Sequence, residues 1–117
     1  MGVDEGDTKY LTNKAFQKGL VDTVVNAAVA NDIYVIIDWH THHAEDNPDE
    51  AVAFFSEMSK KYGHLPNVIY EVYNEPLGNT SWSGTIKPYA IKVINAIRAN
   101  DPDNLIIVGT RMYSQFV

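Results

Sequence analysis

A glutamate with an amide before it and a proline after it follows directly on an apolar run of the sequence. The run covers residues 68–73, and Asn74, Glu75 and Pro76 come next. A carboxylate at the exit of a buried strand can act as an acid, a base or a nucleophile, because the strand holds it in place. A solvated acid that caps the loop before Pro76 is the plain alternative, and the motif alone leaves it open.

Polar and aromatic residues also follow the two other apolar runs. His40, His42 and His43 come after the run at 33–38, and a segment that includes Tyr113 comes after the third run. The three histidines raise the question of a metal. Because His40 and His42 stand two apart on irregular chain and no carboxylate partner is fixed, we predict no metal site. An ordinary polar loop is the favoured interpretation, and no cofactor is called for.

The composition narrows the classes of function. The 117 residues carry fifteen acids against nine bases and a net charge of -6. No basic stripe can form, so neither nucleic acid nor an anionic membrane surface is an expected partner. The sequence contains no cysteine, and no apolar run approaches the roughly 20 residues of a membrane span. The acidic opening at 1–7 is unlike a signal peptide, so we expect any export signal to lie outside these residues.

Three amphipathic helices are expected, over residues 14–30, 48–62 and about 85–100. The second helix has the clearest boundaries, because residues typical of helix starts and stops surround it. These residues are Asn47 as the cap, Pro48 in the first turn, Glu50 three residues after the cap, and Gly63 at the end. Its apolar face is predicted to contain Ala51, Phe54, Phe55, Met58 and Tyr62.

The first helix has weaker boundary signals. Thr12 or Asn13 is expected to cap its start, and Asn31 is predicted to end it in a left-handed conformation. Apolar side chains at helical spacing predict the face that the helix buries. They are Phe16, Leu20, Val24, Ala27 and Ala28.

Short apolar strands are expected between the helices, at 33–38, 67–73 and 104–109. Such strands, alternating with amphipathic helices, indicate a parallel sheet covered on at least one face. Two α/β architectures fit, an open doubly wound sheet and a (β/α)8 barrel. The first usually has a glycine-rich turn after a strand, and none is found here. Polar and aromatic strand ends are typical of the barrel, and the chain forms one domain at most.

Four segments resemble the middle of a glycoside hydrolase family 5 endoglucanase, a cellulase. They are 34–40 (YVIIDWH), 66–76 (PNVIYEVYNEP), 86–90 (IKPYA) and 101–110 (DPDNLIIVGT). Together they are far more specific than an isolated Asn-Glu-Pro. The resemblance implies a (β/α)8 TIM barrel, of which this chain covers about half, from helix 2 through strand 5. It also implies that residues 1–117 are part of the catalytic domain.

The resemblance also implies an activity for the parent enzyme, by which we mean the complete protein that contains these residues. That activity is endo-acting, retaining hydrolysis of β-1,4-glucosidic bonds in cellulose or related β-glucans. Glu75 is similar to the family's general acid/base. Asn74 resembles the residue that hydrogen-bonds the 2-hydroxyl of the sugar being cleaved, and His40 resembles a histidine that contacts the same sugar.

The family's nucleophile is a second glutamate, near the end of strand seven, and this chain does not reach it. The isolated 117 residues are therefore expected to be inactive. The resemblance implies a secreted, monomeric parent enzyme whose partner is a β-glucan polysaccharide or a cello-oligosaccharide. Two interpretations from other classes stay open, a non-catalytic carbohydrate-binding homologue and a structural half-barrel fragment. A glutamate at the end of strand seven of the parent enzyme would favour the enzyme.

Aromatic side chains in the loops are candidates for sugar platforms. Tyr113 stands where the family usually carries tryptophan, and Trp82 lies in the loop after Asn74-Glu75-Pro76. Simple packing is the alternative for both. Trp39 alternates away from His40, so we expect it in the core.

Strand alternation predicts two acids beneath the site. One strand is expected to place Glu75, Tyr73, Glu71 and Ile69 on one face, and the other His40, Asp38, Ile36 and Tyr34. If Glu75 and His40 point into the barrel mouth, Asp38 and Glu71 lie deeper. Buried acids need partners, or their pKa values rise, so we expect a polar cluster there that an arginine from the family's second strand completes.

Overall fold

A computed structural model describes residues 1–4 and 9–116 of the chain. Its three strands are β1 (Val35–Asp38), β2 (Val68–Glu71) and β3 (Ile106–Ile107), and all are parallel, in the order β1-β2-β3. The helices are α1 (Lys14–Ala30), α2 (Pro48–Tyr62), α3 (Lys87–Arg98) and the short α4 (Arg111–Ser114). Short turns η1 (Ala44–Asp46) and η2 (Trp82–Ile86) complete the elements.

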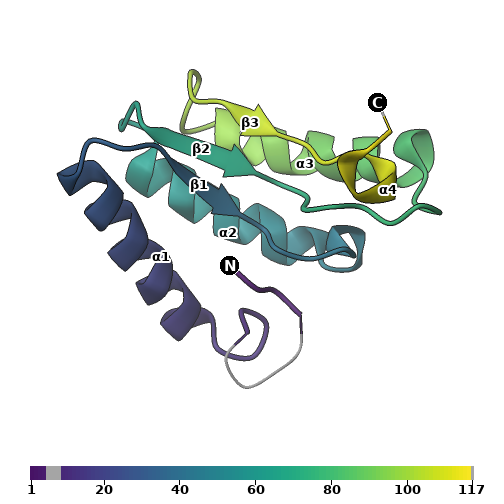
Figure 1. The fold of residues 1–117 in the computed structure, drawn as a ribbon, viewed down its shortest axis with the longest axis horizontal. Coiled ribbons are helices and arrows are strands. Elements are labelled where there is room, and N and C mark those ends of the chain that lie inside the picture. The colour runs from purple at the N-terminus through teal and green to yellow at the C-terminus, as the bar shows by residue number, and fades with distance from the viewer. Residues whose placement is uncertain (5–8, 117) are drawn as a thin grey trace.

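Strands and helices alternate along the chain, and the helices α2 and α3 lie behind the sheet in Figure 1, while α1 runs beside the β1 edge. Each strand is connected to the next by a helix that packs on the same face. This is the repeating unit of a (β/α)8 barrel. None of the helices in residues 1–4 and 9–116 has the length and apolar character needed to span a bilayer.

The core lies between the sheet and the two helices α2 and α3. The predicted apolar face of α2 is confirmed, because all five of its residues are buried. Trp39 is buried among Tyr10, Phe54 and Phe55, which also confirms its predicted place in the core. The opposite face of the sheet is open, and Ile36 is 50% exposed there. The sheet is thus covered on one face only within the described residues.

Helix α2 begins and ends where the sequence predicted, but two of its boundary interactions differ. Asn47 occupies the cap position without a side-chain hydrogen bond. The Glu50 carboxylate does not reach back to it, because Lys14 Nζ holds both of its oxygens at 2.6 and 2.7 Å. Gly63 ends the helix in a right-handed conformation, and glycine is required there because a Cβ would lie 2.5 Å from the Ser59 carbonyl oxygen.

Helix α1 differs more from its prediction. Asn13 caps its start as expected, but Asn31 has a φ of -107°, and the left-handed residue is Asp32, with a φ of 55°. The Asn31 amide instead donates to the Ala27 carbonyl at 2.8 Å. The predicted apolar face is largely wrong for the described residues, since the buried side chains are Gln17, Val25 and Ala28, whereas Phe16, Leu20 and Val24 are 45–57% exposed.

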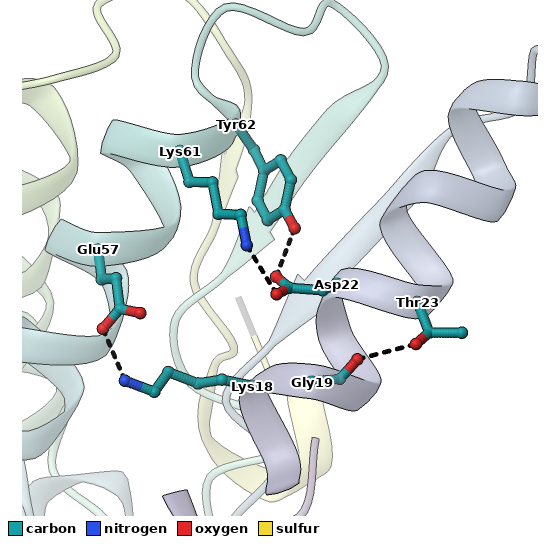
Figure 2. A network of polar contacts seen from close by, with 7 residues as sticks. All are labelled: Lys18, Gly19, Asp22, Thr23, Glu57, Lys61 and Tyr62. Atoms are coloured by element: carbon teal, nitrogen blue, oxygen red, sulfur yellow. Dashed lines mark hydrogen bonds and ion pairs between the residues drawn. The ribbon is translucent and has the colours of Figure 1, made fainter. Parts of the chain in front are cut away.

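Polar contacts tie α1 to α2, as Figure 2 shows. Lys61 Nζ lies 2.6 Å from Asp22 Oδ2, and the Tyr62 hydroxyl donates to the other oxygen of the same carboxylate. Although burial opposes it, these hydrogen bonds lower the pKa of Asp22 below its ordinary value. A second pair joins Lys18 to Glu57 at 2.8 Å. Exposed ion pairs of this kind are individually weak, at about 0.2–1 kcal/mol, so they orient α1 more than they stabilise it.

All three strands are shorter than predicted. Ile33 and Tyr34, expected in the first strand, are 57% and 74% exposed and precede β1. β3 has only the residues Ile106–Ile107, because it pairs with β2 on one side and has no described neighbour on the other. An edge strand loses half of its ladder hydrogen bonds, so its ends are not held in the extended conformation.

Candidate active site

The candidate residues gather at the carboxyl ends of the three strands. The parallel register aligns Asp38 with Glu71 and Glu71 with Ile107, so the segments that follow the three strands leave the sheet at the same end. His40 follows β1 and Glu75 follows β2, with the turn of α4 after β3. Barrels and open α/β sheets place their active and binding sites at this carboxyl end of the strands.

His40 is held by its backbone and by a carboxylate. Residues 1–3 run beside it, since its N–H donates to the Met1 carbonyl at 3.0 Å and Gly2 bridges to it in parallel. Its Nδ1 lies 2.7 Å from Asp38 Oδ2. Because a carboxylate oxygen accepts, Nδ1 is the donor in this pair, and Nε2 is the ring nitrogen left for another partner. The ring is 61% exposed.

Asp38 and Glu71 lie together beneath His40, as the alternation predicted. The other oxygen of Asp38, Oδ1, is buried and has no hydrogen-bond partner within the described residues. Burial raises the pKa of Glu71, and the nearby Asp38 and Glu75 carboxylates raise it further, while His40 opposes them. Buried polar atoms normally have a hydrogen-bond partner, so we expect a hydrogen-bond donor from another part of the protein beside these two acids. The predicted arginine stays a prediction.

The alternation fails at Tyr73, which was predicted on the same face as Glu71 and Glu75. β2 ends at Glu71, and Tyr73 turns into the core, where its exposure is 0%. Its hydroxyl donates to the His42 carbonyl at 3.1 Å and also contacts the Glu45 carboxylate. Its ring meets Tyr89 edge to face at 5.5 Å. The two-residue period holds only while the backbone stays extended.

Glu75 is exposed and has an unusual backbone conformation. Its φ is 45°, in the left-handed region that few residues other than glycine adopt. Asn74 before it is half-buried, and Pro76 after it is buried. The Glu75 carbonyl accepts from His42 Nδ1 at 3.0 Å, and the Pro76 carbonyl accepts from the Tyr113 N–H at 3.0 Å. The loops after β1 and β3 therefore both hold the loop that carries Glu75.

Tyr113 lies close to this loop, whereas Trp82 lines a different cavity. The Tyr113 ring is 48% exposed and meets the His42 ring at 5.8 Å. Trp82 is 44% exposed and lines a cavity of about 350 Å³ with Thr110, Arg111 and Phe116. Neither Glu75 nor Tyr113 lines that cavity. Four of the five predicted site residues thus lie together at the carboxyl ends of the strands, and Trp82 faces a different space.

Sequence reasoning missed His42. The sequence predicts only an ordinary polar loop there, with a metal site as the disfavoured alternative, and the described residues hold no group of three side chains suited to a metal. The structure gives His42 contacts to both Glu75 and Tyr113. Its place two residues after His40, in a segment that leaves the same strand end, was the only signal in the sequence.

Comparisons with known proteins match this chain along nearly its whole length. The family model described as "Cellulase (glycosyl hydrolase family 5)" matches residues 2–117. Endoglucanase Z of Dickeya dadantii is 62% identical over 117 residues, which are 100% of this chain and 27% of that protein. The chain thus spans about a quarter of the length of that relative.

Solved structures match the fold as well. A structure from Cytophaga hutchinsonii has 58% sequence identity and a TM-score of 0.94, and the match covers 98% of this chain and 37% of that one. The catalytic domain of a Thermobifida fusca endoglucanase has 41% identity and a TM-score of 0.82, over 90% of this chain and 35% of that one. A variant of that domain has been solved in complex with cellotetraose.

Proposed function

Because the chain belongs to the cellulase family, glycosyl hydrolase family 5, we propose that residues 1–117 are part of the catalytic domain of an endo-β-1,4-glucanase. Glu75 is its general acid/base. The observation that carries this proposal is the position of Glu75, exposed at the carboxyl end of the central strand and held by the loops on both sides. Replacing it in the parent enzyme is the test developed in the Discussion.

The proposed reaction has two steps that both use Glu75. In the first, Glu75 donates a proton to the glycosidic oxygen while a carboxylate from another part of the parent enzyme attacks the anomeric carbon. The C–O bond breaks and the leaving sugar departs with that proton. In the second, Glu75 takes a proton from the water that hydrolyses the glycosyl-enzyme. A retaining pair needs the two carboxyl groups roughly 5 to 5.5 Å apart.

Asn74 and His40 are proposed to bind the sugar at which cleavage occurs. Asn74 is half-buried beside Glu75, and its amide can hydrogen-bond the 2-hydroxyl, whose hydrogen bonds strengthen in the transition state. With Nδ1 of His40 donating to Asp38, its Nε2 is left to accept from a sugar hydroxyl. Asp38 keeps that tautomer in place, because a carboxylate cannot donate to Nδ1.

Tyr113 is proposed as a platform for a glucose unit, and Trp82 as a further sugar contact. Both rings are about half exposed. The apolar face of a glucose ring packs well on a flat aromatic ring. Cellulose is a polymer too large to enter a cell, so we propose that the parent enzyme acts outside the cell. We also propose that it is a monomer, as the family resemblance implies.

The proposed role of Tyr113 predicts a change in KM. In the parent enzyme, Tyr113→Ala is expected to raise KM for soluble cello-oligosaccharides about 2- to 10-fold, because ring contacts of this kind contribute about 0.5–1.5 kcal/mol. Tyr113→Phe is the matched control, since it keeps the ring and removes only the hydroxyl. Steady-state kinetics check both. An unchanged KM in the alanine variant would remove Tyr113 from the binding site.

A further inference from the structure

We propose that His42 is a positioning residue that sets the backbone of Glu75 and the ring of Tyr113 together. It would thereby link proton transfer to sugar binding. The inference rests on the proposed function, in which Glu75 is the acid/base and Tyr113 contacts the sugar. It deepens that proposal by adding a residue that touches neither the reacting atoms nor the sugar in its assigned role.

The contact between His42 and Glu75 is directional. His42 Nδ1 lies 3.0 Å from the Glu75 carbonyl oxygen. A carbonyl can only accept, so Nδ1 donates, and the two residues are joined although 33 positions separate them in the chain. Glu75 has a φ of 45°, a conformation that costs free energy and persists only where surrounding contacts hold it. The His42 donor is one such contact.

The contact between His42 and Tyr113 comes from the ring. The two rings meet edge to face, with centroids 5.8 Å apart and an interplanar angle of 87°. Tyr113 also has a left-handed backbone, with a φ of 55°, and so do its neighbours Met112 and Ser114. The Tyr113 N–H donates to the Pro76 carbonyl at 3.0 Å. The strained turn after β3 is therefore docked on the Glu75 loop, with His42 packed against both.

His42 is itself anchored to the core. Its carbonyl accepts from the hydroxyl of Tyr73 at 3.1 Å, and Tyr73 is fully buried. Thr41 before it is also buried, and its hydroxyl accepts from the His43 N–H at 3.0 Å. The backbone on both sides of His42 is thus fixed although its ring is exposed. A ring held in this way can position its neighbours, whereas a free surface histidine could not.

Two substitutions separate the roles of the donor and the ring in the parent enzyme. His42→Asn keeps an N–H donor at the place of Nδ1 and removes the ring. His42→Phe keeps an aromatic edge for Tyr113 and removes the donor. We expect the phenylalanine variant to lower kcat on a soluble cello-oligosaccharide about tenfold with KM nearly unchanged, because the Glu75 loop shifts. We expect the asparagine variant to keep kcat and raise KM about threefold.

Two reference variants distinguish the possible failures. His43→Ala changes the exposed neighbour, and its kcat and KM should match the unmodified enzyme. If Glu75→Gln kept full activity, the proposed function itself would fail. If Glu75→Gln were inactive while both His42 variants kept normal kcat and KM, only the role of His42 would be refuted. Equal losses of kcat in both His42 variants, accompanied by a lower Tm, would identify a general structural role and would also refute it.

Discussion

Glu75→Gln in the parent enzyme is expected to lower kcat on a soluble cellulose derivative by about 10²- to 10⁴-fold. Glutamine has nearly the shape of glutamate but can neither give up nor take the proton that both steps require. The substitution changes only the side chain, so the backbone at position 75 can keep its left-handed conformation, and its carbonyl can still accept from His42. Binding of cello-oligosaccharide should therefore survive, which isothermal titration calorimetry measures directly.

Glu57→Gln is the matched control for this substitution. Glu57 lies on α2, and its exposed carboxylate pairs with Lys18 of α1, so its change to glutamine should leave kcat within about twofold, because exposed ion pairs contribute little. Full activity in Glu75→Gln would contradict the assigned role. Loss of both activity and sugar binding would point instead to a collapsed loop.

The isolated 117-residue chain is expected to show no turnover of β-glucan above background. Of the proposed catalytic pair it supplies only Glu75, whereas retaining hydrolysis needs both carboxylates. Within residues 1–4 and 9–116, β3 has no neighbour beyond β2, β1 has only the Gly2 bridge beside its end, and one face of the sheet is uncovered; such edges favour association between chains. A reducing-sugar assay on the purified chain measures turnover, and size-exclusion chromatography measures association between chains.

The parent enzyme assayed at the same molar concentration is the control. Its activity should exceed that of the isolated chain at least about 10²-fold, because loss of one catalytic carboxyl group lowers activity by about 10²- to 10⁴-fold. Host glycosidases are excluded by preparing Glu75→Gln of the isolated chain in parallel. Turnover that the isolated chain shows and this variant lacks would mean that the chain contains a complete site.

The sequence predicted best those elements whose residues satisfy one another locally. Helix α2 has proline in its first turn, two acids beside it and two lysines in its last turn, which complement the helix dipole. Its apolar face follows the helical period without interruption, and every member is buried. Such a segment has the same preferred structure in any α/β context, so its bounds could be read from the sequence.

Predictions that depended on neighbouring elements were less successful. The apolar face of α1 is half exposed, and a cavity of about 200 Å³ lies between that helix and β1, lined by Leu20, Val24 and Ile36 among others. Helical spacing predicts which side chains share a face, but not whether another element covers it. Likewise, β3 is short because a strand paired on one side is held over fewer residues.

The candidate site was predictable where it follows from strand ends. Parallel strands bring His40 and Glu75 to one edge, and alternation places Asp38 and Glu71 below them. His42 and Tyr73 were not predictable in this way. Their contacts depend on how irregular segments turn after the strands end, and the left-handed backbone of Glu75 has no sequence signal because its residue type does not favour it.

The central claim, that Glu75 is the acid/base of a retaining pair, is tested most directly by chemical rescue of Glu75→Ala in the parent enzyme. The substrate is an aryl cellobioside whose leaving group needs no proton, so the glycosyl-enzyme still forms but its hydrolysis, which needs the base, is slow. Azide, which attacks without a base, should restore turnover and give a cellobiosyl azide of retained β configuration. Absence of rescue, or an azide product of inverted configuration, would contradict the claim.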